Sequence, residues 1–124
     1  MKTIIAVESF KAMQQHSLER ARRFDKKEHV ESERRIFFEH PEDMASFLTG
    51  RRLEVLRAAM KQPRSITELA IALKRNRPAI SRDVRALSEV GLIQLNKQSN
   101  PGHGQVQIVR ASAKSFDFRY QLTA

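Results

Sequence analysis

A single segment governs the organisation of this chain, and it reads Arg77-Pro78-Ala79-Ile80-Ser81-Arg82-Asp83-Val84-Arg85-Ala86-Leu87-Ser88-Glu89-Val90. Ile80, Val84 and Leu87 recur at the spacing of one helical face, which predicts a narrow apolar stripe. At about 100° per residue, Arg82 and Arg85 fall on roughly the opposite side of the helix. The segment therefore predicts a helix that buries one face and exposes arginines on the other.

The two ends of the segment carry helix-boundary residues. Pro78 suits a first helical turn, where the N–H that proline lacks would have no helical partner. Gly91 follows the last periodic residue and suits a left-handed C-terminal cap. A short helix of this kind, anchored on one side and basic on the other, fits the DNA major groove.

Charge is distributed unevenly along the chain. Residues 1–49 contain nine Lys/Arg and nine Asp/Glu, whereas residues 50–124 contain fourteen and five. The whole net charge of +9 therefore lies in the part that contains the basic helix. Such a field favours a polyanionic partner, both by attraction and by release of counterions.

Two further helices are expected immediately before the basic helix. Thr49 can cap a helix over residues 50–61, and the Ser65–Glu68 pair has the spacing of a capping box. The second helix then covers residues 66–73, and a tight polar connection over residues 74–76 leads into the basic helix. Three short helices in this order predict a helix-turn-helix with its supporting helix.

A β-hairpin is expected directly after Gly91. Residues 92–95 and 105–110 read as its two strands. The intervening residues 96–104 contain Asn100-Pro101-Gly102 and Gly104, which predicts a long loop at the tip. A hairpin in this position is the wing of a winged helix-turn-helix.

The N-terminal part predicts strands and an amphipathic helix. Residues 3–7 and 35–39 read as strands, and Pro41 opens a short helix. Between the strands, residues 8–25 show a helical period with one apolar face. That face either packs on its own domain or forms a dimer seam or a partner surface.

Near the C-terminus, aromatic and polar residues alternate. This period-two pattern over residues 116–122 predicts a half-buried strand. Its expected neighbours are the strands over residues 3–7 and 35–39, in the same chain or in a second one.

The segments Ser65–Ala70, Arg77–Leu87 and Val90–Ile93 resemble the winged-helix regulators of the MarR/ArsR-like superfamily, and this resemblance covers about residues 50–110. The flanking residues 37–49 are similar to small winged-helix proteins, some of which resemble antitoxins that repress their own operons. Together these observations predict an α+β fold, mainly α: a winged helix-turn-helix domain over 50–110, an N-terminal arm over 1–49 and a C-terminal strand over 111–124.

The resemblance implies a role for each group of residues. Base edges would be read from the basic helix, with guanine O6 and N7 matching the arginine forks, by Arg77, Pro78, Ala79, Ser81, Arg82 and Arg85. Backbone phosphate would be held by Ser65, Thr67, Lys74, Arg75, Lys97 and His103. A dimer or partner contact would involve Phe10, Met13, Leu18, Ala21, Phe24, Phe116, Phe118 and Tyr120.

Other classes of function find little support in the sequence. The chain has no cysteine, which excludes disulfides and favours a cytoplasmic location. Its four histidines show no metal-ligand spacing, and no nucleophile or carboxylate pair is apparent, so we expect no metal, no cofactor and no catalysis. The apolar run at residues 3–7 is too short for a signal peptide or a membrane span.

The expected function is therefore a homodimeric repressor that binds double-stranded DNA at an inverted repeat. An antitoxin would in addition bind a cognate toxin protein. Two alternatives stay open: a module whose main work is to neutralise a protein partner, and a winged helix that binds RNA.

Overall fold

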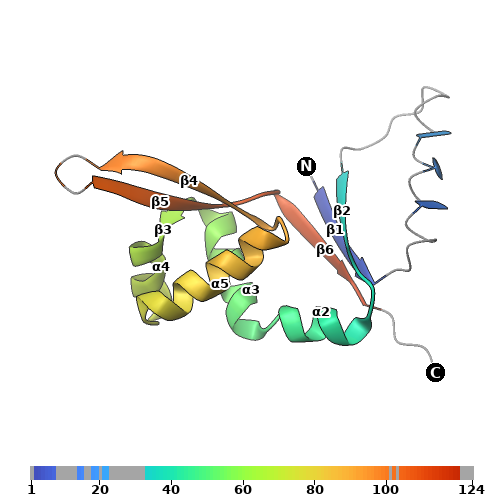
Figure 1. The fold of residues 1–124 in the computed structure, drawn as a ribbon, viewed down its shortest axis with the longest axis horizontal. Helices are drawn as coiled ribbons and strands as arrows, with labels where there is room; N and C mark the ends of the chain where they lie inside the picture. Colours follow the sequence, from blue (N-terminus) through green and yellow to red (C-terminus); the bar gives the residue numbers. More distant parts are fainter. Residues whose placement is uncertain are drawn as a thin grey trace. The chain divides into compact units, whose positions relative to one another are not determined.

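The structure, a computed structural model, describes residues 2–7, 14, 15, 18, 19, 21, 22, 33–100, 102 and 104–120. The chain divides into two compact units, unit 1 (Met1–Phe47 and Ser115–Ala124) and unit 2 (Leu48–Lys114). The elements, shown in Figure 1, are β1 (Lys2–Val7), β2 (Glu33–Phe38), α2 (Pro41–Phe47), α3 (Gly50–Lys61), β3 (Arg64–Ser65), α4 (Ile66–Leu73), α5 (Arg77–Glu89), β4 (Ile93–Asn100), β5 (Gly104–Ala111) and β6 (Ser115–Arg119). The expected α+β fold is confirmed.

The three helices of unit 2 each begin at a side chain that caps the first turn. In each case the cap accepts a hydrogen bond from the N–H three residues later: Arg52 to Thr49 at 3.2 Å, Glu68 to Ser65 at 3.1 Å and Ala79 to Asn76 at 2.8 Å. The Glu68 carboxylate also accepts from the Ser65 N–H at 3.5 Å, which completes the expected capping box. The sequence therefore determines locally where each helix starts.

The end of α5 is also as expected. Gly91 has φ +85°, and the Leu92 N–H donates to the Leu87 carbonyl at 3.0 Å. This six-to-one hydrogen bond around a left-handed glycine is a Schellman cap, which stops the helix and turns the chain into β4.

The core of unit 2 lies between the helices and the base of the hairpin. The apolar stripe of α5 is fully buried, with Ile80, Val84 and Leu87 at 0–1% exposure. It meets Val55 of α3 and Leu69 of α4 in the same core, both of which are also fully buried. The short β3 pairs with β5 and so attaches the start of α4 to the sheet, whose strand order is β3-β5-β4.

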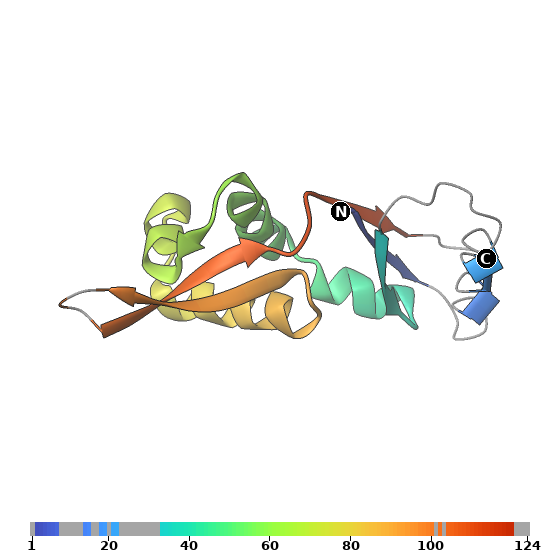
Figure 2. The same cartoon turned by 90° about the horizontal axis from the view of Figure 1, so that it is seen from above.

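The wing is longer in its strands and shorter in its loop than expected. Strands β4 and β5 pair antiparallel along their whole length, from Ile93 opposite Ala111 to Asn100 opposite Gly104. In both views the distal part of the hairpin projects beyond the helices of unit 2 (Figures 1 and 2). Residues 96–99 are exposed polar residues, so no apolar alternation marks them as a strand. Cross-strand backbone hydrogen bonds hold this part of the wing, and they leave no trace in the sequence pattern.

Unit 1 contains a three-stranded parallel sheet in the order β2-β1-β6. The central strand β1 is buried on both faces, as Thr3, Ile4, Ile5 and Ala6 are at most 3% exposed. Helix α2 packs beside β2, where the rings of Phe38 and Phe47 lie 5.6 Å apart. The C-terminal strand pairs with β1 of its own chain, which answers the question that the sequence left open.

An ion-pair group joins β6 to β1. Asp117 accepts hydrogen bonds from the Arg119 guanidinium at 3.0 and 3.1 Å and lies 3.6 Å from the Lys2 Nζ. These contacts, the Arg119 hydrogen bond first, lower the pKa of the Asp117 carboxyl below its ordinary value of 3.8. Because the folded state lowers this pKa, the contribution to stability is present above the ordinary pKa and is lost as the pH falls through the lowered value.

We expect an NMR titration to give a pKa for Asp117 below 3.8 in the native protein. In Arg119→Ala the pKa should rise back toward that value, and Lys2→Ala should raise it by a smaller amount. The lysine variant tests the pairing of β6 with β1, because Lys2 belongs to β1 and Asp117 to β6. If neither substitution changes the Asp117 pKa, the ion-pair group of Asp117 with Arg119 and Lys2 is contradicted.

Candidate nucleic-acid interface

Helix α5 presents its basic face to solvent. Arg77, Pro78, Arg82 and Arg85 are exposed, and Ala79 and Ser81 are partly exposed, so all six residues expected to read bases are accessible. Four of them, Pro78, Ser81, Arg82 and Arg85, line one groove of about 350 Å³. The sequence period and the structure thus agree on which side of α5 faces outward.

Arg77 lies in a second, smaller groove. It shares this groove of about 180 Å³ with Thr67 at the start of α4 and with Gln105 and Gln107 of β5. The groove therefore brings the starts of α4 and α5 together with one strand of the wing. Thr67 is exposed there, as expected for a phosphate contact, and Lys97 is exposed on β4.

Two of the residues expected to hold phosphate are largely buried. Ser65 is only 6% exposed, and its hydroxyl is used by the capping box of α4. The Arg75 side chain is 9% exposed and is engaged in an ion pair. Both expectations assumed that a polar residue beside a helix start faces solvent, but each of these residues is needed inside the fold. Lys74 is exposed, and His103 lies outside the described residues.

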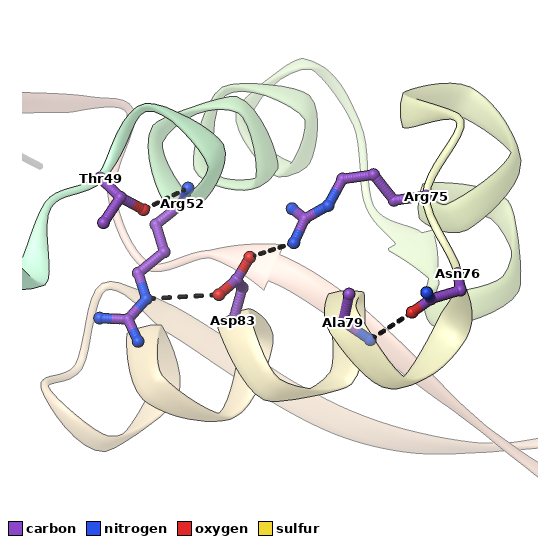
Figure 3. Close-up of polar contacts among 6 residues, drawn as sticks. All are labelled: Thr49, Arg52, Arg75, Asn76, Ala79 and Asp83. Atoms are coloured by element: carbon purple, nitrogen blue, oxygen red, sulfur yellow. Dashed lines mark hydrogen bonds and ion pairs between the residues drawn. The ribbon is translucent and has the colours of Figure 1, made fainter.

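The buried partner of Arg75 is Asp83, which the sequence reading did not single out. Arg75 donates from Nη2 to one Asp83 carboxylate oxygen at 2.6 Å, and Arg52 donates from Nε to the other at 3.4 Å. Asp83 itself is 5% exposed. Figure 3 shows the carboxylate of α5 between the two guanidinium groups, one from α3 and one from the turn after α4.

A signal for this bridge was present in the sequence. Asp83 lies three residues after Ile80 and one before Val84, on the face that carries the apolar stripe. A carboxylate in that position must be buried, and a buried charge requires a charged partner. What the sequence could not supply was the partner, since Arg52 is 31 positions away.

Lys74 takes a strained conformation in the turn between α4 and α5. Its φ of +54° and ψ of +47° are left-handed, and it is the one residue other than glycine with positive φ in the described part of the chain. The N–H of Lys74 donates to the Ile71 carbonyl and that of Arg75 to the Ala70 carbonyl. This turn sets the angle between α4 and α5 and places Arg75 within hydrogen-bond distance of Asp83.

Of the residues expected at a dimer or partner surface, those on β6 are accessible. Phe118 is 36% exposed and Tyr120 is 51% exposed, and the Phe116 ring stacks on that of Phe118 at 6.4 Å. Leu18 is 57% exposed and Ala21 is also exposed. Phe10, Met13 and Phe24 lie outside the described residues.

Within the described residues, no cluster of His, Asp or Glu is arranged to hold a metal ion. Their helices also include none with the length and apolar character that a membrane crossing requires.

A protein-family model, HVO_A0114, matches residues 47–109, which is half of the chain and covers α3 to β5. The chain belongs to the HVO_A0114 family. No curated protein matches it.

Among solved structures, the chain is similar to a protein from Methanosarcina mazei Go1 described as a possible transcriptional regulator. The two share 25% identity at a TM-score of 0.52, over 60% of this chain and 64% of the other. The chain thus spans less than two thirds of the length of that protein. The helices α3, α4 and α5 followed by the β4–β5 hairpin make a winged helix-turn-helix, which confirms the expected fold.

Two other structures give weaker matches. One is the homodimeric winged helix-turn-helix domain of Mb0332 from Mycobacterium bovis, with 19% identity and a TM-score of 0.47 over 62% of this chain and 74% of that one. The other is Lactococcus lactis ZitR in complex with DNA, with 19% identity and a TM-score of 0.48 over 86% and 68%. The resemblance to antitoxins stays a prediction.

We expect Asp83→Asn to lower the free energy of unfolding by about 3 kcal/mol, because it leaves two largely buried guanidinium groups without their counter-charge. This is the lower end of the usual range, since Arg52 remains partly accessible to water. Urea unfolding followed by circular dichroism measures the loss. Glu89→Gln removes an exposed carboxylate from the same helix and serves as the control, and equal stability of the two variants would contradict a structural role for the bridge.

Proposed function

We propose that this protein is a sequence-specific transcriptional regulator that binds double-stranded DNA through α5 and acts as a repressor. The observation that carries the proposal is the groove on the outer face of α5, where Arg82 and Arg85 lie side by side. The similarity to the Methanosarcina mazei protein, which is described as a possible transcriptional regulator, supports the same function.

The geometry of α5 suits reading in the major groove. This groove is about 12 Å wide, which is the diameter of a helix with its side chains. Arg82 and Arg85 are three residues apart and therefore neighbours on one helical face. Each guanidinium can donate two parallel hydrogen bonds to guanine O6 and N7, while Pro78 offers an apolar surface to a thymine methyl group.

The surroundings of α5 supply contacts that are independent of sequence. Thr67 and Arg77 share a groove beside the wing, and a hydroxyl and a guanidinium both bind phosphate oxygens. Lys97 is carried outward by the wing, where it can reach the backbone or the minor groove. We assign to these residues the positioning of the protein, and to α5 the reading of bases.

We further propose that the protein acts as a homodimer on an inverted repeat. A two-fold dimer places its two recognition helices about 34 Å apart, or roughly 10 bp centre to centre. Occupation of such a site at a promoter is sufficient for repression. The exposed aromatic residues of β6 are the proposed contact between copies, and a role in neutralising a partner protein is the second candidate for the same surface.

We expect Arg82→Ala and Arg85→Ala each to weaken binding to a selected DNA site by about 1–3 kcal/mol, with little change on scrambled DNA, because base contacts are lost. Gel-shift titration against both DNAs measures the difference. Arg57→Ala is the control, since Arg57 is an exposed arginine of α3 in a different groove. Equal losses on selected and scrambled DNA would show that these arginines hold phosphate and do not read bases.

We expect the double variant Phe118→Ser and Tyr120→Ser to convert the protein from twice the mass of its 14.3 kDa chain to a single chain. The reason is the loss of the exposed apolar surface of β6. Light scattering during gel filtration measures the mass, and circular dichroism verifies the fold. A variant that stays dimeric would exclude β6 as the interface and leave its surface to a partner protein.

A further inference from the structure

A pocket lies at the start of α3, on the other side of Arg82 from the base-reading groove. It has a volume of about 580 Å³, and its walls include Thr49, Gly50 and Arg51 of the helix start together with Arg75, Arg82 and Asp83. Arg52 and Glu54 complete the lining. Of these lining residues, the function proposed above uses Arg82 alone, on its side toward the base-reading groove.

The charges around the pocket leave a positive excess. Four arginines face two carboxylates, and both oxygens of Asp83 are engaged by Arg52 and Arg75. Arg51 and Arg82 are exposed, and neither has an ion-pair partner within the described residues. Because Arg82 is assigned to base reading, the Arg51 guanidinium is the one of these two that is available to an anion in this pocket.

The backbone of α3 adds further donors. The Thr49 hydroxyl accepts only the Arg52 N–H, so the N–H groups of Gly50 and Arg51 precede the first turn without helical partners. α3 has twelve residues, and its N-terminal end carries a partial positive charge. A side chain added at Gly50 would meet nothing within 4 Å, which leaves the approach to these N–H groups open.

A second observation points to a ligand independently of the helix start. The Arg75 side chain is nine-tenths buried in the pocket wall, and its Nε and Nη1 are buried atoms without a hydrogen-bond partner in the described structure. Asp83 uses only the Nη2 of this group. Buried guanidinium donors are normally satisfied, so an oxyanion in the pocket would supply what the protein leaves open.

We propose that this pocket binds one phosphate of the DNA backbone, held by Arg51, by the N–H groups that open α3 and by the free donors of Arg75. The proposal rests on the proposed function, because it deepens the same interface. A phosphate bound here would fix the position of α3 on the DNA. Because the Arg52–Asp83 contact joins α3 to α5, the position of α5 would be fixed as well. The contact would thus set the register in which Arg85 meets its base.

The test uses the full chain and Arg51→Ala, with Arg57→Ala as the matched control on the same helix. We expect Arg51→Ala to weaken binding about tenfold on selected and scrambled DNA alike, since a hydrogen bond to a charged group is lost. The slope of log affinity against log salt should fall by about one unit. Arg57→Ala should change neither, and Arg51→Lys should keep the slope because it keeps the charge.

A second measurement separates this site from the proposed function. Inorganic phosphate is titrated without DNA, and the amide signals of Gly50 and Arg51 are followed by NMR in the native protein and in Arg51→Ala. The proposal expects shifts in the native protein alone, together with the DNA effects above. Shifts without any effect of Arg51→Ala on DNA would mean an adventitious ion only, which overturns the proposal.

The remaining outcomes are also decisive. If phosphate shifts the amide signals but the protein binds no DNA, the proposed function is wrong. The pocket would then bind a free anion, and the proposal that it binds a phosphate of the DNA backbone would be wrong as well. If Arg51→Ala binds DNA as strongly as Arg57→Ala does, and phosphate does not shift the amide signals, the pocket is not a phosphate site. The proposal that α5 reads bases would be unaffected.

Discussion

The buried carboxylate of Asp83 is the interaction on which the winged helix-turn-helix unit depends. It lies on the core side of α5 and holds Arg52 of α3 and Arg75 of the inter-helix turn at once. Taking three charged groups out of water is costly, so this arrangement tolerates little displacement of any of them. Because Asp83 must face inward, its neighbour Arg82 is turned toward solvent, and Arg85 follows three residues later, almost one full turn along the same face. The orientation of the reading face is thus fixed from inside the core.

Local chemistry explains why so much of unit 2 could be predicted from the sequence. Thr49, Ser65 and Gly91 act on groups within a few residues of themselves, so their spacing alone locates the helix ends. The apolar stripe of α5 is likewise a local period. Asp83 breaks that stripe with a charge, and the break was visible; its partners were not, because one of them is 31 residues distant and only the fold brings it near. Arg75 was assigned to the surface because its ion pair with Asp83 could not be recognised from the sequence, whereas Ser65 was assigned there although its capping hydrogen bond is local.

The wing shows the opposite limit. Val109 at the base of the wing is fully buried and belongs to the apolar pattern that predicts a strand. Residues 96–99 are exposed and polar and show no such pattern. Paired backbone hydrogen bonds hold these residues in strands whatever their side chains are. A sequence reading that relies on apolar alternation ends each strand where the core ends, and so it assigns the outer half of the wing to a loop. The part that projects beyond the helices is therefore the part that hydrophobic periodicity describes least well.

Unit 1 adds a constraint of topology. Its central strand β1 pairs in parallel with β2 and with β6, and parallel neighbours require a crossover connection. Between β1 and β6 that connection contains the whole of unit 2, which begins after α2 and ends just before β6. Unit 2 is therefore connected through the chain to strands of one sheet at both of its ends. Periodicity predicted each strand, yet it assigned β6 to a separate terminal segment, since pairing between the two ends of a chain has no local signal. A winged helix inserted in this way is bound covalently on two sides to unit 1, so any change in the pairing of β6 acts directly on the residues that follow β5.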